Sequence, residues 1–300
     1  MSVYSIKDLE HLSGIKAHTL RIWEQRYNFI KPKRTVTNIR YYDDDDLKLV
    51  LNISLLKNSG LKISKISKMS LQEMSQEVLR LTDQNLGFPE QIHALTLSMI
   101  DLNEERFEKI LATNILQLGF EKTMIKIIFP FLTKIGVLWQ TGSISPSHEH
   151  FITHLVRQKI IVAVDGQFIS NNEYHKKYML FTPEGELHEL SLLFASYLIK
   201  ARKNKVVYLG QSLPFADLAS VHQIHEPDFL FSVITSTPGQ DKIQAYVDDL
   251  ANTFPNTTVL LTGFQVVGQD IKCPSNVIIV NRLEELIDFI EVSNNKVATE

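Results

Sequence analysis

The chain from residue 175 to its end contains five short apolar runs, and they constrain the fold more than any other feature. They lie at 178–182, 205–210, 229–235, 258–263 and 276–280. Segments that fit helices separate or follow them, at 186–204, 214–225, 239–255 and 282–293. Strands that alternate with helices form a parallel sheet, and right-handed crossovers place the helices on both faces. We therefore expect a five-stranded, doubly wound parallel sheet over 175–300.

The carboxyl ends of these strands are where such a sheet binds ligands. Glu186 and His188 follow the first predicted strand. Mostly small and hydroxyl residues follow the others: Gly210, Ser212, Ser232, Ile234, Ser236, Thr262 and Gly263. The glycine-rich fingerprint of dinucleotide-binding sheets is missing after the first strand, and the sequence has no Gly-Lys-Ser or Gly-Lys-Thr triplet. The pattern therefore predicts a ligand site that is neither a dinucleotide site nor a P-loop.

Charge is distributed unevenly along the chain. Residues 1–70 contain 13 Lys and Arg against 7 Asp and Glu, whereas the remaining residues contain 18 against 27. A basic head on an acidic body is typical of a protein whose head binds a polyanion. Taken alone, the charge also fits a solvated basic surface.

The basic head has the pattern of a helix-turn-helix. Ser5 is a candidate N-cap for a first helix that ends at Gly14. In the next helix Leu20, Trp23 and Tyr27 share one face and should pack inward. The outward positions hold polar and basic residues: His18, Thr19, Arg21 and Arg26. Two short helices joined by a glycine-containing turn indicate a DNA-binding unit.

A small two-stranded wing is predicted next. Pro32 stops the second helix, and Val36, Ile39 and Tyr41 alternate after it. Basic residues suited to phosphates flank them: Lys31, Lys33, Arg34 and Arg40. The run Asp43–Asp46 indicates a helix N-terminus rather than a metal site, because adjacent helical positions point in different directions.

In this order of elements the sequence resembles the MerR family of transcriptional regulators. The resemblance rests on YSIKDLEHLSGIKAHTLRIWEQRY, KPKR, IRYY and LKNSGLKISKI. It implies a unit that grips double-stranded operator DNA as a dimer, one half-site per subunit. The residues it places at DNA are His18, Thr19, Arg21, Arg26, Tyr27, Arg34 and Arg40, with His18 and Thr19 near base edges. Core packing is the alternative for Trp23 and Tyr27, and we favour it for Trp23.

Four helices with short connections are predicted in the middle of the chain, at 90–101, 102–119, 120–142 and 146–164. They indicate an antiparallel four-helix bundle, with a kink at Pro130. We expect domains at 1–75, 89–170 and 175–300, with a linker at 76–88. The fold class is thus multidomain: a winged helix-turn-helix, a bundle and a flavodoxin-like α/β domain.

Trp139, Glu149 and His150 have a spacing that resembles the bundle domain of the cobalamin-dependent photoreceptor regulators, the CarH and LitR group. That resemblance implies that the three residues cover the upper face of adenosylcobalamin. A Glu-His pair that caps its helix and faces water is the alternative. A metal site at His148, His150 and His154 is disfavoured, because no carboxylate or cysteine is placed as in a known zinc motif.

The α/β region resembles the cobalamin-binding domain. Glu186 and His188 match an acidic residue followed two positions later by histidine, which implies that His188 is the lower axial ligand of cobalt and Glu186 its partner. Ser232 and Ile234 resemble a serine-x-leucine element. Ser191 stands where the family has glycine, and Thr262–Gly263 stands where it has paired glycines. The added side chains would crowd the buried nucleotide tail of the cofactor, so a domain that has lost its cofactor remains an alternative.

We predict a DNA-binding transcriptional regulator, not an enzyme, whose C-terminal domains sense cobalamin and control oligomerisation as a homodimer or homotetramer. The resemblance implies that light breaks the cobalt–carbon bond of adenosylcobalamin and releases DNA. The alternative is a tail that serves cofactor-free oligomerisation or binding of a protein partner. A corrinoid methyl carrier would leave the basic head without a role.

The compartment is predicted from cysteine and apolar content. Cys273 is the one cysteine, which excludes an intramolecular disulfide and fits a reducing compartment. The start of the chain is not of the signal-peptide type, and the apolar runs are too short to cross a bilayer. We therefore expect a cytoplasmic protein with no membrane partner.

Overall fold

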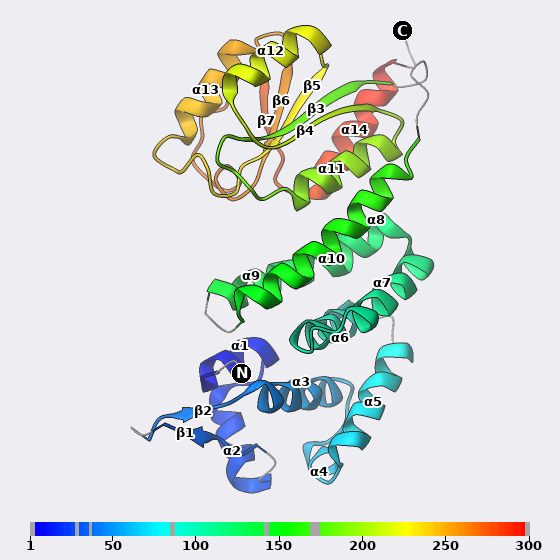
Figure 1. Cartoon of the computed structure of the whole chain (residues 1–300), viewed down its shortest axis with the longest axis vertical. Coiled ribbons are helices and arrows are strands. Elements are labelled where there is room, and N and C mark those ends of the chain that lie inside the picture. The colour runs from blue at the N-terminus through cyan, green and yellow to red at the C-terminus, as the bar shows by residue number, and fades with distance from the viewer. Residues whose placement is uncertain are drawn as a thin grey trace. The chain divides into compact units, whose positions relative to one another are not determined.

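The structure of the protein, a computed structural model, describes residues 4–27, 30–35, 38–84, 88–140, 144–168 and 175–297. The chain forms two compact units, residues 1–155 and 156–300 (Figure 1). Helix α10 (Pro146–Asp165) begins in the first unit and ends in the second. The predicted fold class is confirmed: a winged helix-turn-helix, further helices and an α/β sheet follow one another along the chain.

The first unit is helical except for the wing. Its elements are α1 (Ile6–Ser13), α2 (Ala17–Tyr27), β1 (Lys33–Arg34), β2 (Arg40–Tyr41), α3 (Asp44–Asn58), α4 (Ile63–Ile66), α5 (Leu71–Gln84), α6 (Phe88–Ile100), α7 (Glu104–Leu118), α8 (Phe120–Thr123), the π-helical turn η1 (Met124–Ile128) and α9 (Phe129–Gln140). Strands β1 and β2 pair antiparallel, which confirms the wing. Helix α3 packs against α1, α5 and α6, so the head and the following helices share contacts within this unit.

The ends of α1 and α3 are set by local side chains. Ser5 caps α1 in a capping box with Asp8, and Gly14 ends the helix with a φ of 71°. Asp43 caps α3 in the same way, with Asp46 as its partner. Each box satisfies N–H groups that the first helical turn leaves unpaired. The predicted cap at Ser5 and the predicted role of the aspartate run are confirmed.

Helix α5 occupies most of the segment that the sequence predicted as a linker. The helix runs from Leu71 to Gln84 and packs on α3 and α6. The segment forms a helix because it is amphipathic: Met74 and Val78 lie at helical spacing, and both are buried. The linker predicted at 76–88 therefore lies largely within helix α5, and the domain limits stay predictions.

The third predicted bundle helix changes its hydrogen-bonding pattern near Pro130. The turn η1 lies between α8 and α9 and ends at Ile128, two residues before this proline. Pro130 has no N–H to donate to the carbonyl of Lys126, so the α-helical ladder is interrupted there. The kink predicted at Pro130 stays a prediction, and the structure shows a π-helical turn just before this residue.

The second unit is a five-stranded parallel sheet in the order β4-β3-β5-β6-β7. Its strands are β3 (Lys177–Pro183), β4 (Lys205–Leu213), β5 (Phe229–Val233), β6 (Thr258–Thr262) and β7 (Val277–Ile279), and its helices are α11 (Leu190–Ala201), α12 (Phe215–His225), α13 (Ile243–Thr253) and α14 (Leu283–Val297). Figure 1 shows α12 and α13 on one face and α11 and α14 on the other. All five predicted strands and the double winding are confirmed.

Alternate residues of the strands build a core on each face of the sheet. Met179 and Phe181 are fully buried against residues of α12 and α13. On the other face Phe229 packs edge-on against Phe289 of α14, with ring centroids 5.1 Å apart. Each such side chain contributes about 1.5 to 3 kcal/mol on burial. The packed sheet therefore fixes the positions at which the loops of its carboxyl edge begin and end.

Candidate functional site

The loop that carries Glu186 and His188 lies between β3 and α11, at the carboxyl edge of the sheet. The sequence predicted a helix from 186, but α11 begins only at Leu190. The loop stays non-helical because Thr182 donates from its hydroxyl to the carbonyl of Glu186 at 2.8 Å, and the Glu186 carboxylate turns toward the loop after β5. That part of the helix prediction is wrong.

Glu186 is a buried carboxylate, and both of its oxygens accept hydrogen bonds. It accepts hydrogen bonds from the backbone N–H groups of Thr235 (2.8 Å), Ser236 (2.5 Å) and Thr237 (3.2 Å). The hydroxyl of Ser236 and the backbone N–H of His188 also donate to it. Burial by itself would raise its pKa, but these donors, led by the N–H groups of Ser236 and His188, lower the pKa to about 2. Glu186 is therefore a fixed anion at neutral pH.

His188 is presented to solvent by this anion. Its side chain is 65% exposed, and its Nδ1 lies 2.6 Å from Oε1 of Glu186. An ionised carboxylate only accepts hydrogen bonds, so Nδ1 carries the proton and Nε2 of the neutral ring keeps its lone pair. Within the described ranges no hydrogen bond engages Nε2. An imidazole with one nitrogen held and the other open is arranged as a metal ligand.

The end of β4 holds the same loop from the other side. The Gln211 side chain donates to the carbonyl of Leu187 at 2.6 Å, and the N–H of Gly185 donates to the Ser212 hydroxyl at 3.0 Å. The hydroxyls of Ser212 and Ser236 bond to the His188 loop, a role that depends on which strands are neighbours. Packing of these residues against a ligand stays a prediction.

A second part of the site lies near the carboxyl ends of β5 and β6. Ser232 is fully buried, and its hydroxyl is unpaired as far as the structure describes the chain. Gly263 has a φ of +109°, and a Cβ added to it would lie 2.4 Å from the carbonyl oxygen of Ile234. Thr262 and Ser191 are half-buried. An unpaired buried hydroxyl costs free energy, so Ser232 fits a polar group of a bound molecule.

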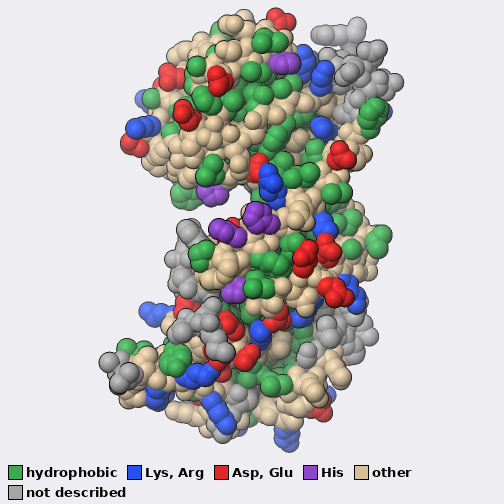
Figure 2. Space-filling view, in the orientation of Figure 1, with side chains coloured by type: hydrophobic (Ala, Val, Ile, Leu, Met, Phe, Trp, Pro, Cys, Tyr) green, Lys and Arg blue, Asp and Glu red, His purple; other side chains and the backbone are tan. Residues whose placement is uncertain are grey.

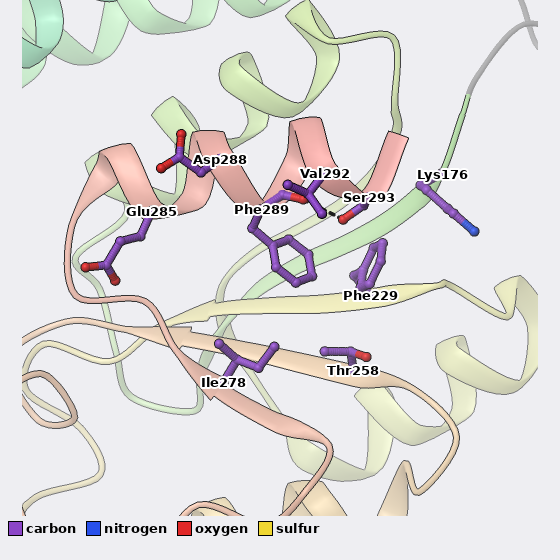
Figure 3. Close-up of a pocket in the computed structure, with 9 residues that line it drawn as sticks. All are labelled: Lys176, Phe229, Thr258, Ile278, Glu285, Asp288, Phe289, Val292 and Ser293. Carbon is purple, nitrogen blue, oxygen red and sulfur yellow. Dashed lines mark hydrogen bonds between the residues drawn. The ribbon is translucent and has the colours of Figure 1, made fainter. Parts of the chain in front are cut away.

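A hollow of about 570 Å³ lies at the opposite end of the sheet (Figure 3). Phe229, Ile278, Phe289 and Val292 give it an apolar floor, while Lys176 and two acidic residues of α14 stand at its rim. It opens at the amino ends of β3, β5 and β6, where parallel sheets do not place their ligands. The His188 loop therefore remains the candidate site of this unit.

The first turn of α10 carries the other predicted cofactor residues. Glu149 accepts a hydrogen bond from the Thr153 hydroxyl at 2.6 Å, and its other oxygen lies 3.4 Å from Nε2 of His150. The His150 side chain is 70% exposed. The side chain of Trp139, near the end of α9, lies outside the described residues.

Helix α2 presents a basic outer face in the first unit (Figure 2). Arg21 and Arg26 are exposed, and the Arg26 guanidinium lies 5.5 Å from the centre of the Tyr27 ring. His18 is exposed, with Nε2 3.3 Å from the Thr19 hydroxyl. Trp23 is 5% exposed, so its predicted core role is confirmed. Such a face suits the major groove and its flanking phosphates.

The wing residues differ in how available they are to a phosphate. Arg34 is exposed and donates to the side-chain oxygen of Asn38 at 2.7 Å. Arg40 is half-buried and 3.5 Å from the Glu24 carboxylate, so much of its charge is already balanced. Four further lysines around α4 are exposed: Lys57, Lys62, Lys65 and Lys68.

Two segments of the chain match known families. Residues 4–73 match the MerR HTH family regulatory protein description, and residues 91–163 match a B12 binding domain. The chain is 25% identical to the HTH-type transcriptional repressor CarH of Myxococcus xanthus, over 79% of this chain and 81% of that one. It is 23% identical to the repressor CarA of the same organism, over 81% of each chain. The resemblance predicted from the sequence is thus confirmed.

The fold has a counterpart among solved structures. The Methanosarcina barkeri monomethylamine corrinoid protein superposes with a TM-score of 0.54 at 13% identity, over 73% of this chain and 99% of that one. At this identity the likeness shows the fold alone. Among the helices that the structure describes, none has the length and apolar character needed to span a membrane.

Proposed function

We propose that this DNA-binding regulator, which joins a MerR-type head to a cobalamin-binding-type sensor region, takes adenosylcobalamin as its ligand and changes its assembly state on binding. The observation that carries the proposal is the pairing of Glu186 with His188. A buried anion holds Nδ1 and leaves Nε2 open toward solvent. No catalytic role is assigned to the chain.

His188 would hold the cobalt from below, through Nε2. Glu186 would keep the ring in the tautomer that exposes Nε2 and would make it a better donor. Ser232 would pair with a polar group of the nucleotide tail, beside the close approach of Gly263 to Ile234. Trp139, Glu149 and His150 are proposed for the upper face, as the resemblance implies. When bound, adenosylcobalamin supplies a light-sensitive cobalt–carbon bond.

The residues proposed to bind DNA fall into phosphate contacts and base contacts. Phosphates would be contacted by Arg21, Arg26, Tyr27, Arg34 and Arg40, which yields affinity without sequence information. Arg40 would contribute less charge than the other arginines, because Glu24 already balances part of it. His18 and Thr19, exposed or half-exposed on α2, would reach base edges. The chain would bind as a dimer or a larger homo-oligomer.

Regulation needs only that cobalamin binds one assembly state better than another. A ligand shifts such an equilibrium by the difference between its two affinities. Light would change the ligand at the upper face. The difference between the two affinities would then be lost, and DNA would be released.

The test is to incubate the purified chain with adenosylcobalamin in darkness, then record its visible spectrum and its elution from a sizing column before and after illumination. We expect a red protein whose elution changes with light. His188→Ala should weaken binding and alter the bound spectrum, whereas His225→Ala, an exposed histidine of the same unit, should not. An unchanged spectrum and affinity in His188→Ala would remove the lower-ligand assignment.

A second function is favoured by one observation. Ser191 and Thr262 replace two glycines of the resemblance and are half-buried near the carboxyl edge of the sheet. If they close the space for the nucleotide tail, the second unit serves cofactor-free oligomerisation or binding of a protein partner. Colourless protein that takes up no adenosylcobalamin would support this function.

A further inference from the structure

Glu189, the residue after His188, makes a set of contacts that the proposed site does not use. Its side chain is 9% exposed, and its carboxylate accepts from Nε of Arg157 at 2.5 Å and from the Tyr208 hydroxyl at 3.2 Å. Glu189 occupies the N-cap position of α11, yet its side chain makes no capping hydrogen bond. Ser, Thr, Asp and Asn are the residues that ordinarily cap a helix through their side chains, and glutamate is not among them. The Glu189 carboxylate binds Arg157 and Tyr208 instead.

Arg157 comes from α10, the helix that begins in the first unit and ends in the second. His150, His154 and Arg157 are spaced by four and three positions, so they share one face of this helix. The face of α10 that carries His150 near its start therefore carries, two turns later, the arginine that holds Glu189. One continuous helix thus connects the loop of His188 with the first unit.

Separating Arg157 from Glu189 costs free energy of folding. The Glu189 carboxylate is buried, and a buried charge that loses its partner is strongly destabilising. Tyr208 holds the same carboxylate from β4, and burial, followed by the nearby Glu189 charge, raises the pKa of its phenol, so it stays a donor. The Arg157 side chain is 45% exposed, so Glu189 is the buried member of the pair, and it ties the His188 loop to Arg157 and Tyr208.

We propose that Arg157 and Glu189 form a positioning pair that couples the His188 loop to helix α10 and so carries the state of the cobalamin site to the DNA-binding unit. The inference rests on the proposed function. It assigns neither residue to the cofactor itself. The two residues set how strongly cobalamin binding changes the affinity of the protein for DNA.

The test measures this coupling in the full chain. Arg157→Ala, Glu189→Gln and the charge-exchanged double variant Arg157→Glu/Glu189→Arg are compared with wild type. Arg282→Ala is the control, because Arg282 pairs with Glu285 on the exposed start of α14. The DNA probe is a duplex enriched from a random-sequence pool by cobalamin-loaded wild type. The readout is the ratio of its Kd with and without saturating adenosylcobalamin in darkness.

We expect a wild-type ratio within the usual range for coupled sites, about 5- to 150-fold. Both single variants should bring the ratio toward 1 even when cobalamin is saturating, and the exchanged pair should restore part of it. Arg282→Ala should leave it unchanged. In cofactor-free protein, amide hydrogen exchange at 184–189 should be faster in Arg157→Ala than in the control.

Ratios equal to wild type in both single variants would overturn the positioning pair and leave the proposed function intact. A wild type that takes up no adenosylcobalamin would overturn both. If Arg157→Ala does not fold, Tyr208→Phe removes only one contact of Glu189 and should lower the ratio by a smaller factor. No change in Tyr208→Phe and Glu189→Gln together would then count against the pair.

Discussion

Glu186→Gln tests the anchor of the candidate site, because it removes the charge and nearly keeps the shape. The pKa of this carboxyl falls from its ordinary value of 4.5 to about 2 in the folded chain. That difference corresponds to about 3 kcal/mol in favour of the charged form. Water around the exposed His188 ring screens part of it, so we expect the variant to lose about 2 kcal/mol of unfolding free energy at pH 7.

The pH dependence has a defined sign. The folded pKa lies below the unfolded one, so the stabilisation is complete above about pH 5 and is lost as pH falls through the folded value. Glutamine does not titrate. The stability difference between wild type and Glu186→Gln should therefore be largest at neutral pH and shrink steadily below about pH 4.5.

Urea unfolding of the full chain at pH 7, 5 and 3.5, followed by circular dichroism, measures this difference. With a slope of about 2 kcal/mol per molar urea, the midpoint of the second unit should fall by about 1 M at pH 7. Glu184→Gln is the matched control, because Glu184 is exposed in the same loop. A midpoint like that of wild type at pH 7, or a difference that stays constant down to pH 3.5, would refute the reasoning.

Two further predictions concern the head and the sheet edge. Arg21→Ala should weaken binding to specific and random DNA alike and reduce the slope of log affinity against log salt by about 1 per subunit, measured by fluorescence anisotropy; an unchanged slope would count against a phosphate contact. Gly263→Ala should cost about 3 kcal/mol in urea unfolding, because its methyl would meet the Ile234 backbone. Gly268→Ala, with open space around the added methyl and a φ of +73°, should cost only about 1 kcal/mol. Equal losses in the two glycine variants would contradict the close approach.

Much of the fold is predictable because its signals are local. Ser5 and Gly14 mark the ends of α1 by their own backbone preferences, and the five apolar runs become the five strands. The sequence interpretation placed a linker at 76–88 without predicting helix α5, although Met74 and Val78 lie at helical spacing. Contacts with α3 and α6 hold this amphipathic helix in place.

The sequence by itself determined the order of parts, the residue types at the strand ends, and the resemblance that singled out Glu186 and His188. Only the tertiary structure decided how these residues are used. Strand order brings the loop after β5 to the Glu186 carboxylate, and the end of β4 to the same loop. Arg157 reaches Glu189 across 32 positions of sequence. Such pairings depend on which elements become neighbours in space, and no local preference of the chain encodes them.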